Sequence, residues 1–232
     1  MNNKFLKTAF AGLALSVSGF ANAGLITNGF TFSVASDSDQ SSGSHFHSST
    51  GGDYGNPSGK AEIGNYDTEE VRGLSEYDMA GQLAALSAFV TFDVFSYGLF
   101  ADTNDFPFTG TIDVLVYEGN NLEELNDYQA VVTSTIGSFS TFGLNFGDVL
   151  SFDVLPAFNN AISNSWSSFG VRLQTEDTVD SGGAWVFDDF RLTTTDDSSN
   201  DVPEPSTLAI FALGMIGLAS RRFKKPSKRQ ER

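Results

Sequence analysis

The sequence predicts an all-β fold: an antiparallel two-sheet β-sandwich of jelly-roll-like form, flanked by an N-terminal signal helix and a short C-terminal transmembrane helix. Runs of alternating apolar and polar residues recur along the middle of the chain, separated by Gly, Asn and Asp, which is typical of half-buried antiparallel strands. Helical periodicity is scarce. The chain also contains 22 phenylalanines, and each buried Phe side chain stabilises a core by about 2–3 kcal/mol.

We expect about seven strands or more between Gly24 and Val202, a span long enough for one domain with a substantial core. A short helix is expected over Pro156 to Ser163, with proline at its start, and a helical turn over Leu122 to Tyr128. The clearest alternating runs cover residues 30–34, 90–94, 112–117, 150–154, 169–173 and 185–190.

Residues 1–23 have the three parts of a secretory signal peptide. Lys4 and Lys7 form a basic region, Thr8 to Phe20 is apolar, and Ala21-Asn22-Ala23 is an A-x-A cleavage site. The apolar run is shorter than the roughly 20 residues that span a bilayer. We therefore interpret it as a cleaved signal and expect the Sec machinery to export the chain.

The exported part is strongly acidic. Between Gly24 and Val202 the sequence has four basic and 27 acidic residues, a net charge of −23, whereas the whole chain carries −16. Such a domain repels phosphate backbones, so we expect no nucleic-acid partner. The chain has no cysteine, which excludes disulfides, a thiol nucleophile and thiolate metal ligands.

Two polar segments interrupt or follow the domain, which we place at residues 24–192. Residues 37–60 are rich in Ser and Gly and bury little surface, so we interpret them as a mobile loop. Residues 193–202 contain T-T-T-D-D-S-S-N-D and are interpreted as a flexible acidic linker.

Residues 203–232 have three ordered parts. Pro203-Glu204-Pro205 is an extended element that prolines keep from being helical. Residues 207–220 contain an apolar stretch that we expect to be a short transmembrane helix, and residues 221–232 hold seven basic residues and one acidic one. A basic cluster after an apolar helix stays cytoplasmic, so the tail would lie inside and the domain outside. A helix this short suits a temporary anchor.

This order, V-P-E-P-S followed by an apolar helix and a basic tail, resembles the PEP-CTERM sorting signal of Gram-negative bacteria. The resemblance implies recognition by exosortase, a membrane transpeptidase-like enzyme, with Pro203, Glu204 and Pro205 as the recognition element. It also implies a transient stay in the inner membrane, then a place at the cell surface or in the extracellular matrix, with exopolysaccharide and biofilm as the associated context.

A second resemblance covers parts of the domain. V-R-G-L-S-E-Y, A-F-V-T-F-D-V, F-D-V-L-P-A-F-N-N-A-I, S-F-G-V-R-L and W-V-F-D-D-F-R-L follow in an order similar to jelly-roll domains of other PEP-CTERM proteins and, more loosely, to carbohydrate-binding modules. It implies the fold and no particular ligand.

Asp188 and Asp189 are candidate ligands for structural Ca²⁺. Because side chains alternate along a strand, one of them would point inward, where a carboxylate needs a partner or a cation. In the resembling modules a carboxylate at this place helps to hold Ca²⁺, an ion that takes six to eight oxygen ligands. The alternative, which we favour, is a salt bridge to Arg172 or Arg191.

Other candidate sites are weaker. The alternate spacing of His45-Phe46-His47 could place two imidazoles on one face, but no third ligand is evident and the segment is expected to be mobile, so we assign no metal site. Trp166 lies among polar residues and is a candidate platform for sugar rings, with partial burial as the alternative, whereas Trp185 fits a core position. Carboxylate pairs and Ser-His-Asp sets occur too readily by chance to mark a catalytic site.

We therefore expect a non-enzymatic structural or adhesive component of the cell surface or matrix, associated with exopolysaccharide or biofilm. The alternatives are a carbohydrate-binding, lectin-like module and a secreted hydrolase. No cofactor is expected apart from the structural Ca²⁺ considered above.

Overall fold

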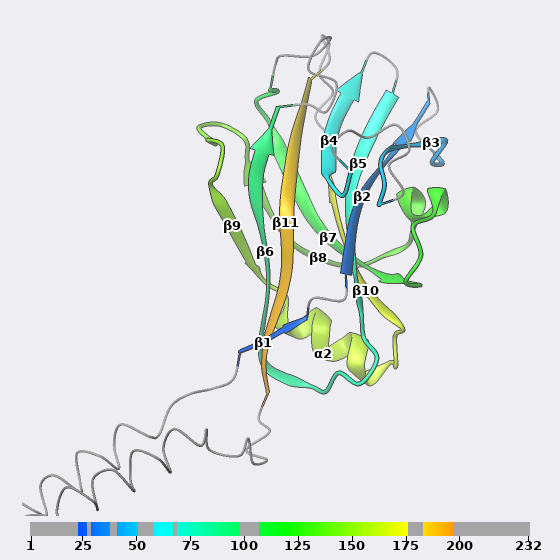
Figure 1. Cartoon of the computed structure of the whole chain (residues 1–232), viewed down its shortest axis with the longest axis vertical. Helices are drawn as coiled ribbons and strands as arrows, with labels where there is room; N and C mark the ends of the chain where they lie inside the picture. Colours follow the sequence, from blue (N-terminus) through cyan, green and yellow to red (C-terminus); the bar gives the residue numbers. More distant parts are fainter. Residues whose placement is uncertain are drawn as a thin grey trace, which may run out of the picture. The chain divides into compact units, whose positions relative to one another are not determined.

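The computed structural model describes residues 23–26, 29–37, 41–50, 58–66, 69–97, 107–175 and 183–196, which form eleven strands and two short helices (Figure 1). The strands are β1 (Ala23–Ile26), β2 (Gly29–Ser36), β3 (His45–Ser48), β4 (Ala61–Tyr66), β5 (Glu69–Asp78), β6 (Ala85–Ser96), β7 (Thr111–Gly119), β8 (Val132–Ser140), β9 (Val149–Asp153), β10 (Ser168–Gln174) and β11 (Gly183–Asp196). The helices are the 3-10 helix η1 (Leu125–Gln129) and the α-helix α2 (Leu155–Ser163).

The strands belong to one antiparallel sheet with the order β8-β7-β10-β5-β4-β11-β6-β9, to which β1 is added at β11 and β2 with β3 at β5. The sheet branches at β5. One edge of β5 pairs with β2, while the other edge pairs with β10 over residues 73–78 and with β4 over residues 69–71. β10 and β4 therefore start two arms of the same sheet.

The main core combines the inner side chains of both arms. Gly73 of β5 lies where the arms diverge, and a Cβ atom added there would be only 2.7 Å from the Cβ of Ala61 on β4. At the far ends of the arms, the ring of Phe139 on β8 lies 5.8 Å from that of Phe152 on β9. The sheet is thus nearly closed around a core that includes Val90, Phe92, Ile112, Val114, Phe158, Phe169, Val171, Trp185 and Phe187.

A second, smaller core lies on the opposite face of β2, β5 and β7. Its buried members are Phe32, Val34, Leu74, Tyr117 and Tyr128. Strand β3 and helix η1 cover this face with Phe46 and Leu125. Strands β2, β5 and β7 are consequently buried on both faces.

The all-β prediction is confirmed, and the six clearest alternating runs fall on strands, except that the run 150–154 ends one residue beyond β9. The short helix occurs as α2 and the helical turn as η1. The finer prediction, a jelly-roll-like sandwich of two sheets, is not confirmed, because the strands form a single branched sheet that is nearly closed.

Two boundaries differ from the sequence-based expectation. Within residues 37–60, predicted to be a mobile loop, His45–Ser48 form β3, and Phe46 of this strand packs on the second core. The predicted linker at residues 193–202 overlaps β11, because Thr193, Thr194 and Thr195 pair with β1 on one side and with β6 on the other. Threonine is well suited to such a doubly paired strand because it is β-branched.

Residues 1–22 of the predicted signal peptide (residues 1–23) and the sorting signal, including its predicted transmembrane segment at 207–220, lie outside the described residues, whereas Ala23 is the first residue of β1. Among the residues that are described, no helix is both long enough and apolar enough to cross a membrane.

Candidate functional site

Strand β3 brings both histidines of the chain to one face. His45 and His47 are two residues apart on the strand, so their side chains point the same way, and their ring centroids are 5.2 Å apart. Phe46 between them points to the other face, where its ring lies 6.3 Å from that of Phe32. Burial of Phe46 therefore fixes the direction of the two imidazoles.

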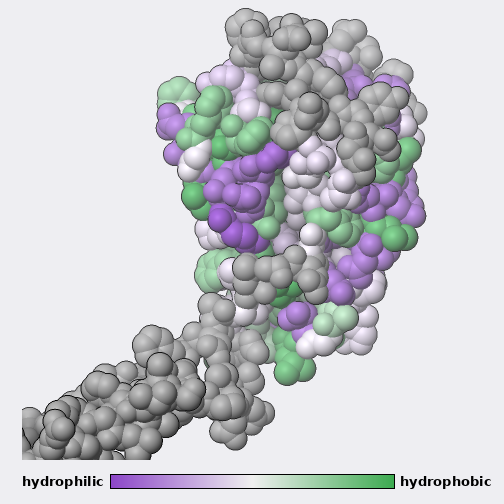
Figure 2. Space-filling model, in the orientation of Figure 1, coloured by the Kyte–Doolittle hydropathy of each residue, from purple (hydrophilic) through white to green (hydrophobic). Residues whose placement is uncertain are grey.

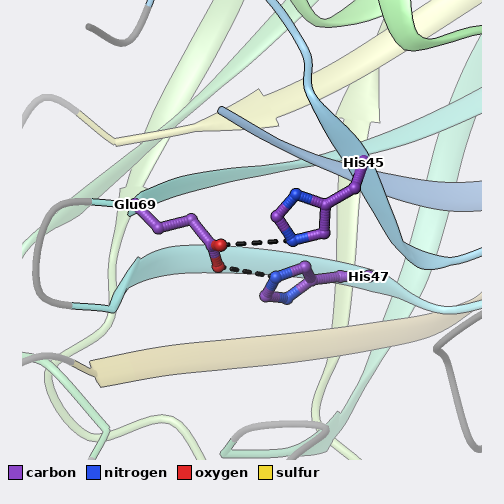
Figure 3. A group of neighbouring side chains, drawn as sticks. All are labelled: His45, His47 and Glu69. Atoms are coloured by element: carbon purple, nitrogen blue, oxygen red, sulfur yellow. Dashed lines mark ion pairs between the residues drawn. The ribbon is translucent and has the colours of Figure 1, made fainter. Parts of the chain in front are cut away.

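The carboxylate of Glu69, the first residue of β5, contacts both imidazole rings (Figure 3). Its two carboxylate oxygens lie 3.2 Å from Nε2 of His45 and 2.6 Å from Nε2 of His47. One carboxylate thus contacts the Nε2 atom of each histidine.

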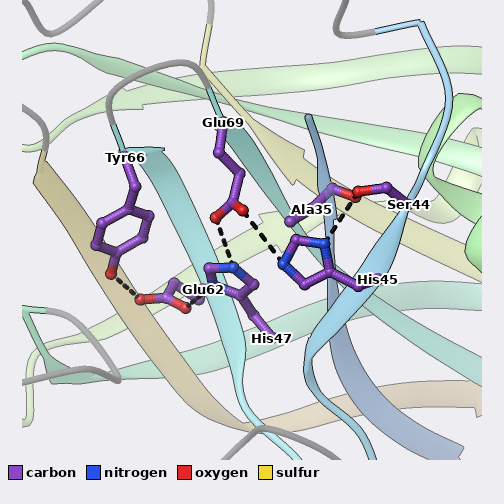
Figure 4. Close-up of polar contacts among 7 residues, drawn as sticks. All are labelled: Ala35, Ser44, His45, His47, Glu62, Tyr66 and Glu69. Carbon is purple, nitrogen blue, oxygen red and sulfur yellow. Dashed lines mark hydrogen bonds and ion pairs between the residues drawn. The ribbon is translucent and has the colours of Figure 1, made fainter. Parts of the chain in front are cut away.

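A second carboxylate holds His47 from the other side (Figure 4). Oε2 of Glu62, on β4, lies 2.8 Å from Nδ1 of His47, and the hydroxyl of Tyr66 donates a hydrogen bond to the other oxygen of Glu62. The Glu62 side chain is 0% exposed. A fully buried carboxylate is costly unless charged or polar groups contact it, and here both of its oxygens have such contacts.

His45 is held less deeply. Its Nδ1 lies 3.0 Å from Oγ of Ser44, which donates to the carbonyl oxygen of Ala35, so that the hydroxyl oxygen remains to accept from Nδ1–H. The His45 side chain is 31% exposed, against 5% for His47. The cluster is therefore buried at Glu62 and open to solvent at His45.

The charge of His47 follows from its neighbours. Burial by itself would lower the pKa of His47, but hydrogen bonds and charge attraction from Glu62 and Glu69 outweigh it and raise the pKa to about 9. At neutral pH, His47 is a cation between two carboxylates. This ion-pair network ties β3 to β4 and β5.

His45, His47 and Glu69 are also the one group of three or more potential metal-ligating side chains among the described residues, with ligand atoms all within 4.8 Å of one another. The sequence indicated the His-x-His pair but neither acid. Glu69, the third potential ligand, lies on β5 and not on β3, so the spacing of residues around the histidines could not have indicated it.

The structure places Asp188 and Asp189 outside the core. Asp188 forms a salt bridge with Lys60, and neither predicted arginine partner is used, because Arg191 pairs with Asp93 and Arg172 donates to backbone carbonyls. Strict alternation breaks down at Asp189, which has a φ of 49° where the register with β6 shifts.

This bulge turns the next residue, Phe190, towards the core, where its ring lies 4.7 Å from that of Phe92. Asp189 is left exposed. The expectation that one of the two acids points into the core is therefore wrong. Structural Ca²⁺ at Asp188 and Asp189 stays a prediction.

The two tryptophans differ as the sequence indicated. Trp185 is buried, and its Nε1–H donates to the carbonyl oxygen of Phe108. Trp166 follows α2 and is half-buried, with its ring 6.5 Å from that of Phe169. The candidate platform therefore exposes only part of its ring, and the recognition element Pro203, Glu204 and Pro205 lies outside the described residues.

A more exposed set of aromatic rings lies at the end of β6 and in the loop between β8 and β9. This aromatic edge consists of Tyr97, Phe142 and Phe146, of which Phe142 is 81% and Phe146 55% exposed. Tyr97 links the edge to the core, because its ring lies 4.6 Å from Phe146 and 5.3 Å from Trp185. Figure 2 shows hydrophobic surface at the upper left, where β9 and the preceding loop lie in Figure 1.

Comparison with known proteins identifies one segment near the C-terminal end of the chain. No curated protein matches it. Residues 201–225 match the family model described as the PEP-CTERM protein-sorting motif, and this range includes the predicted recognition element at residues 203–205. The chain therefore carries a PEP-CTERM sorting signal, which marks it as an exported protein that exosortase recognises and that passes through the membrane during sorting.

Proposed function

We propose that the exported domain is a non-enzymatic component of the cell surface or extracellular matrix that acts by association with exopolysaccharide. The observation that supports this most is the aromatic edge, a set of exposed rings on a protein that its sorting signal sends out of the cell. Exposed apolar surface of this kind commonly marks a binding surface.

The chemistry of the edge suits a polymer of sugars. Aromatic rings provide flat apolar faces with little conformational entropy to lose, and the apolar faces of sugar rings can stack on them. The net charge of the domain opposes an acidic polymer, so binding to such a polymer requires either neutral segments or bridging divalent cations.

The test is binding of the purified exported protein to exopolysaccharide from the producing bacterium, with and without Ca²⁺. Saturable binding is expected, and Phe142→Ser together with Phe146→Ser should weaken it at least about tenfold, by the loss of two stacking rings of about 1 kcal/mol each. Leu83→Ser is the control, because the exposure of Leu83, 66%, lies between those of Phe142 and Phe146 but Leu83 lies between β5 and β6. Equal binding by both variants would reject the aromatic edge as the contact surface.

A carbohydrate-binding, lectin-like module is the second candidate, supported by the same rings and by the partly exposed Trp166. It differs from a matrix component in discrimination between sugars. On a glycan array, a lectin-like module would bind a small set of related glycans and lose them in Trp166→Ala or in the Phe142 and Phe146 variants. Weak retention without preference would favour the matrix role.

A further inference from the structure

We propose that His45, His47 and Glu69 form a binding site for one divalent transition-metal ion of the zinc type. The proposal is independent of the association with exopolysaccharide, because the three residues lie on β3 and β5, whereas the aromatic edge lies at β6 and the loop between β8 and β9.

The donor atoms already converge. Nε2 of His45 and Nε2 of His47 lie 3.2 and 2.6 Å from the two oxygens of Glu69. In a tetrahedral site with bonds of about 2.0–2.1 Å, neighbouring ligand atoms are about 3.4 Å apart. Small rotations of the side chains would therefore admit an ion, with no movement of the strands.

The groups that contact the Nδ1 atoms of the two histidines are those expected around a metal site. A histidine that binds a metal through Nε2 usually has its Nδ1–H held by a carboxylate or another oxygen, which fixes the tautomer and the direction of the ring. His47 has Glu62 in this position and His45 has Ser44. Glu62 is in turn held by Tyr66, so it acts as a positioning residue.

The charges favour a dication. Glu62 and Glu69 together carry two negative charges, and a dication replacing the proton of His47 would balance them. The surrounding exported part, with a net charge of −23, raises the local concentration of cations. Two imidazoles and one carboxylate suit Zn²⁺, Cu²⁺ or Ni²⁺, whereas Ca²⁺ and Mg²⁺ prefer sites made of oxygen atoms alone.

The composition of the chain makes the experiment unambiguous. It has two histidines and no cysteine, so the imidazole ¹⁵N signals report on this site alone. The exported protein is purified without a polyhistidine tag, labelled with ¹⁵N and titrated with ZnCl₂ by calorimetry and by NMR. We expect one ion per chain, a shift of Nε2 of both rings on binding, and displacement of protons into the buffer.

Variants separate this site from adventitious binding to an acidic surface. His45→Gln and Glu69→Gln should each weaken Zn²⁺ binding at least about tenfold. Glu118→Gln, which removes the same charge from an exposed position on β7, should leave it unchanged. His45 is partly exposed, so its variant should fold, and the backbone NMR spectrum verifies this.

Three results would overturn the proposal. The first is imidazole signals that do not move at saturating Zn²⁺, which would leave the cluster as an ion-pair network only. The second is equal loss of affinity in Glu118→Gln, and the third is displacement of Zn²⁺ by an equal concentration of Ca²⁺. Loss of the exopolysaccharide interaction would not bear on any of these readouts.

Discussion

One glycine of the sheet, Gly170, shows how a single residue holds the second core in place. Gly170 on β10 lies beneath the ring of Tyr117, and an added Cβ would be 2.4 Å from the ring. The ring cannot move away readily, because its hydroxyl donates a hydrogen bond to Glu76. Glu76 also accepts from Ser168 and from the backbone N–H of Asn121, so the whole group depends on the space that glycine leaves.

We predict that Gly170→Ala lowers the free energy of unfolding by about 2 kcal/mol, the usual cost of overpacking. Gly137→Ala on β8 is the control, because the Cβ there would make only ordinary contacts with Phe152 at 3.8 Å. Its effect should be within about 0.5 kcal/mol. Urea unfolding of the two variants measures both, and equal destabilisation would show that the contact with Tyr117 is not the cause.

Asp127 is a residue whose charge state depends on its burial. Its carboxylate accepts the backbone N–H of Glu124 at the start of η1. Burial and the nearby charges of Glu76 and Glu124 raise the pKa of Asp127 to about 7, although the hydrogen bond opposes this. Because the folded pKa lies above the unfolded one, the native state holds a proton that the unfolded state has lost between about pH 4 and 7.

The contribution of Asp127 to stability is therefore complete below about pH 4 and is lost as the pH rises to 7. Asp127→Asn keeps an acceptor for Glu124 but cannot ionise. We expect it to match the parent at pH 4 and to exceed it by on the order of 2 kcal/mol at pH 8, as measured by urea unfolding across this range. Asp153→Asn, which removes a charge from an exposed position, is the control, and a similar gain there would refute the explanation.

At the scale of elements, two arginines of the sheet, Arg172 and Arg72, hold the end of η1 through hydrogen bonds. Nη1 of Arg172 on β10 donates to the carbonyl oxygens of Tyr128 and Ala130 at the end of η1. Arg72 on β5 donates to the same carbonyl oxygen of Tyr128, and its guanidinium group lies 3.9 Å from the centre of the Tyr128 ring. Burial lowers the pKa of Arg172 to about 10, so it remains charged at neutral pH.

We predict that Arg172→Met destabilises the protein by about 2 kcal/mol, because the carbonyl oxygen of Ala130 loses the hydrogen bond from Arg172 and that of Tyr128 keeps only the one from Arg72. Arg191→Met removes a half-exposed arginine that pairs with Asp93, and it should cost less than about 1 kcal/mol. Chemical unfolding compares the two, while hydrogen exchange at η1 should rise only in Arg172→Met. Equal costs would show that Arg172 does not anchor the helix.

β6 shows why alternation predicts a strand well when only one of its faces is buried. On β6, Val90, Phe92 and Val94 enter the main core while their neighbours are exposed or half-buried. β5 was harder to predict, because Arg72 and Glu76 on its other face are also covered. Their partners lie on η1, β7 and β10, and a single sequence does not show which distant groups will compensate a buried charge.

The candidate site was predictable only in part for the same reason. The His-x-His pair is visible in the sequence, but its segment looks like a polar loop because seven of its ten residues from 41 to 50 are Ser, Gly or Thr. What makes it a strand is the burial of Phe46 and the two glutamates contributed by β4 and β5. The bulge at Asp189 was equally hidden, since strict alternation is the default expectation for a strand.

At the scale of the whole molecule, the acidic and basic residues are divided between the exported part and the two ends of the chain. The exported part carries nearly all of the acidic residues, whereas the positive charge is concentrated at the two ends. We expect the basic tail behind the sorting motif to stay in the cytoplasm until processing removes it. The mature protein would therefore be much more acidic than its precursor.

The mass of the protein recovered from the cell surface tests this account most directly. Intact-mass spectrometry should find a chain that begins at Gly24, after the A-x-A site, and that lacks the basic tail from Arg221 to Arg232. A surface protein that still ends at Arg232 would contradict exosortase processing, and one that still begins at Met1 would contradict export through a cleaved signal.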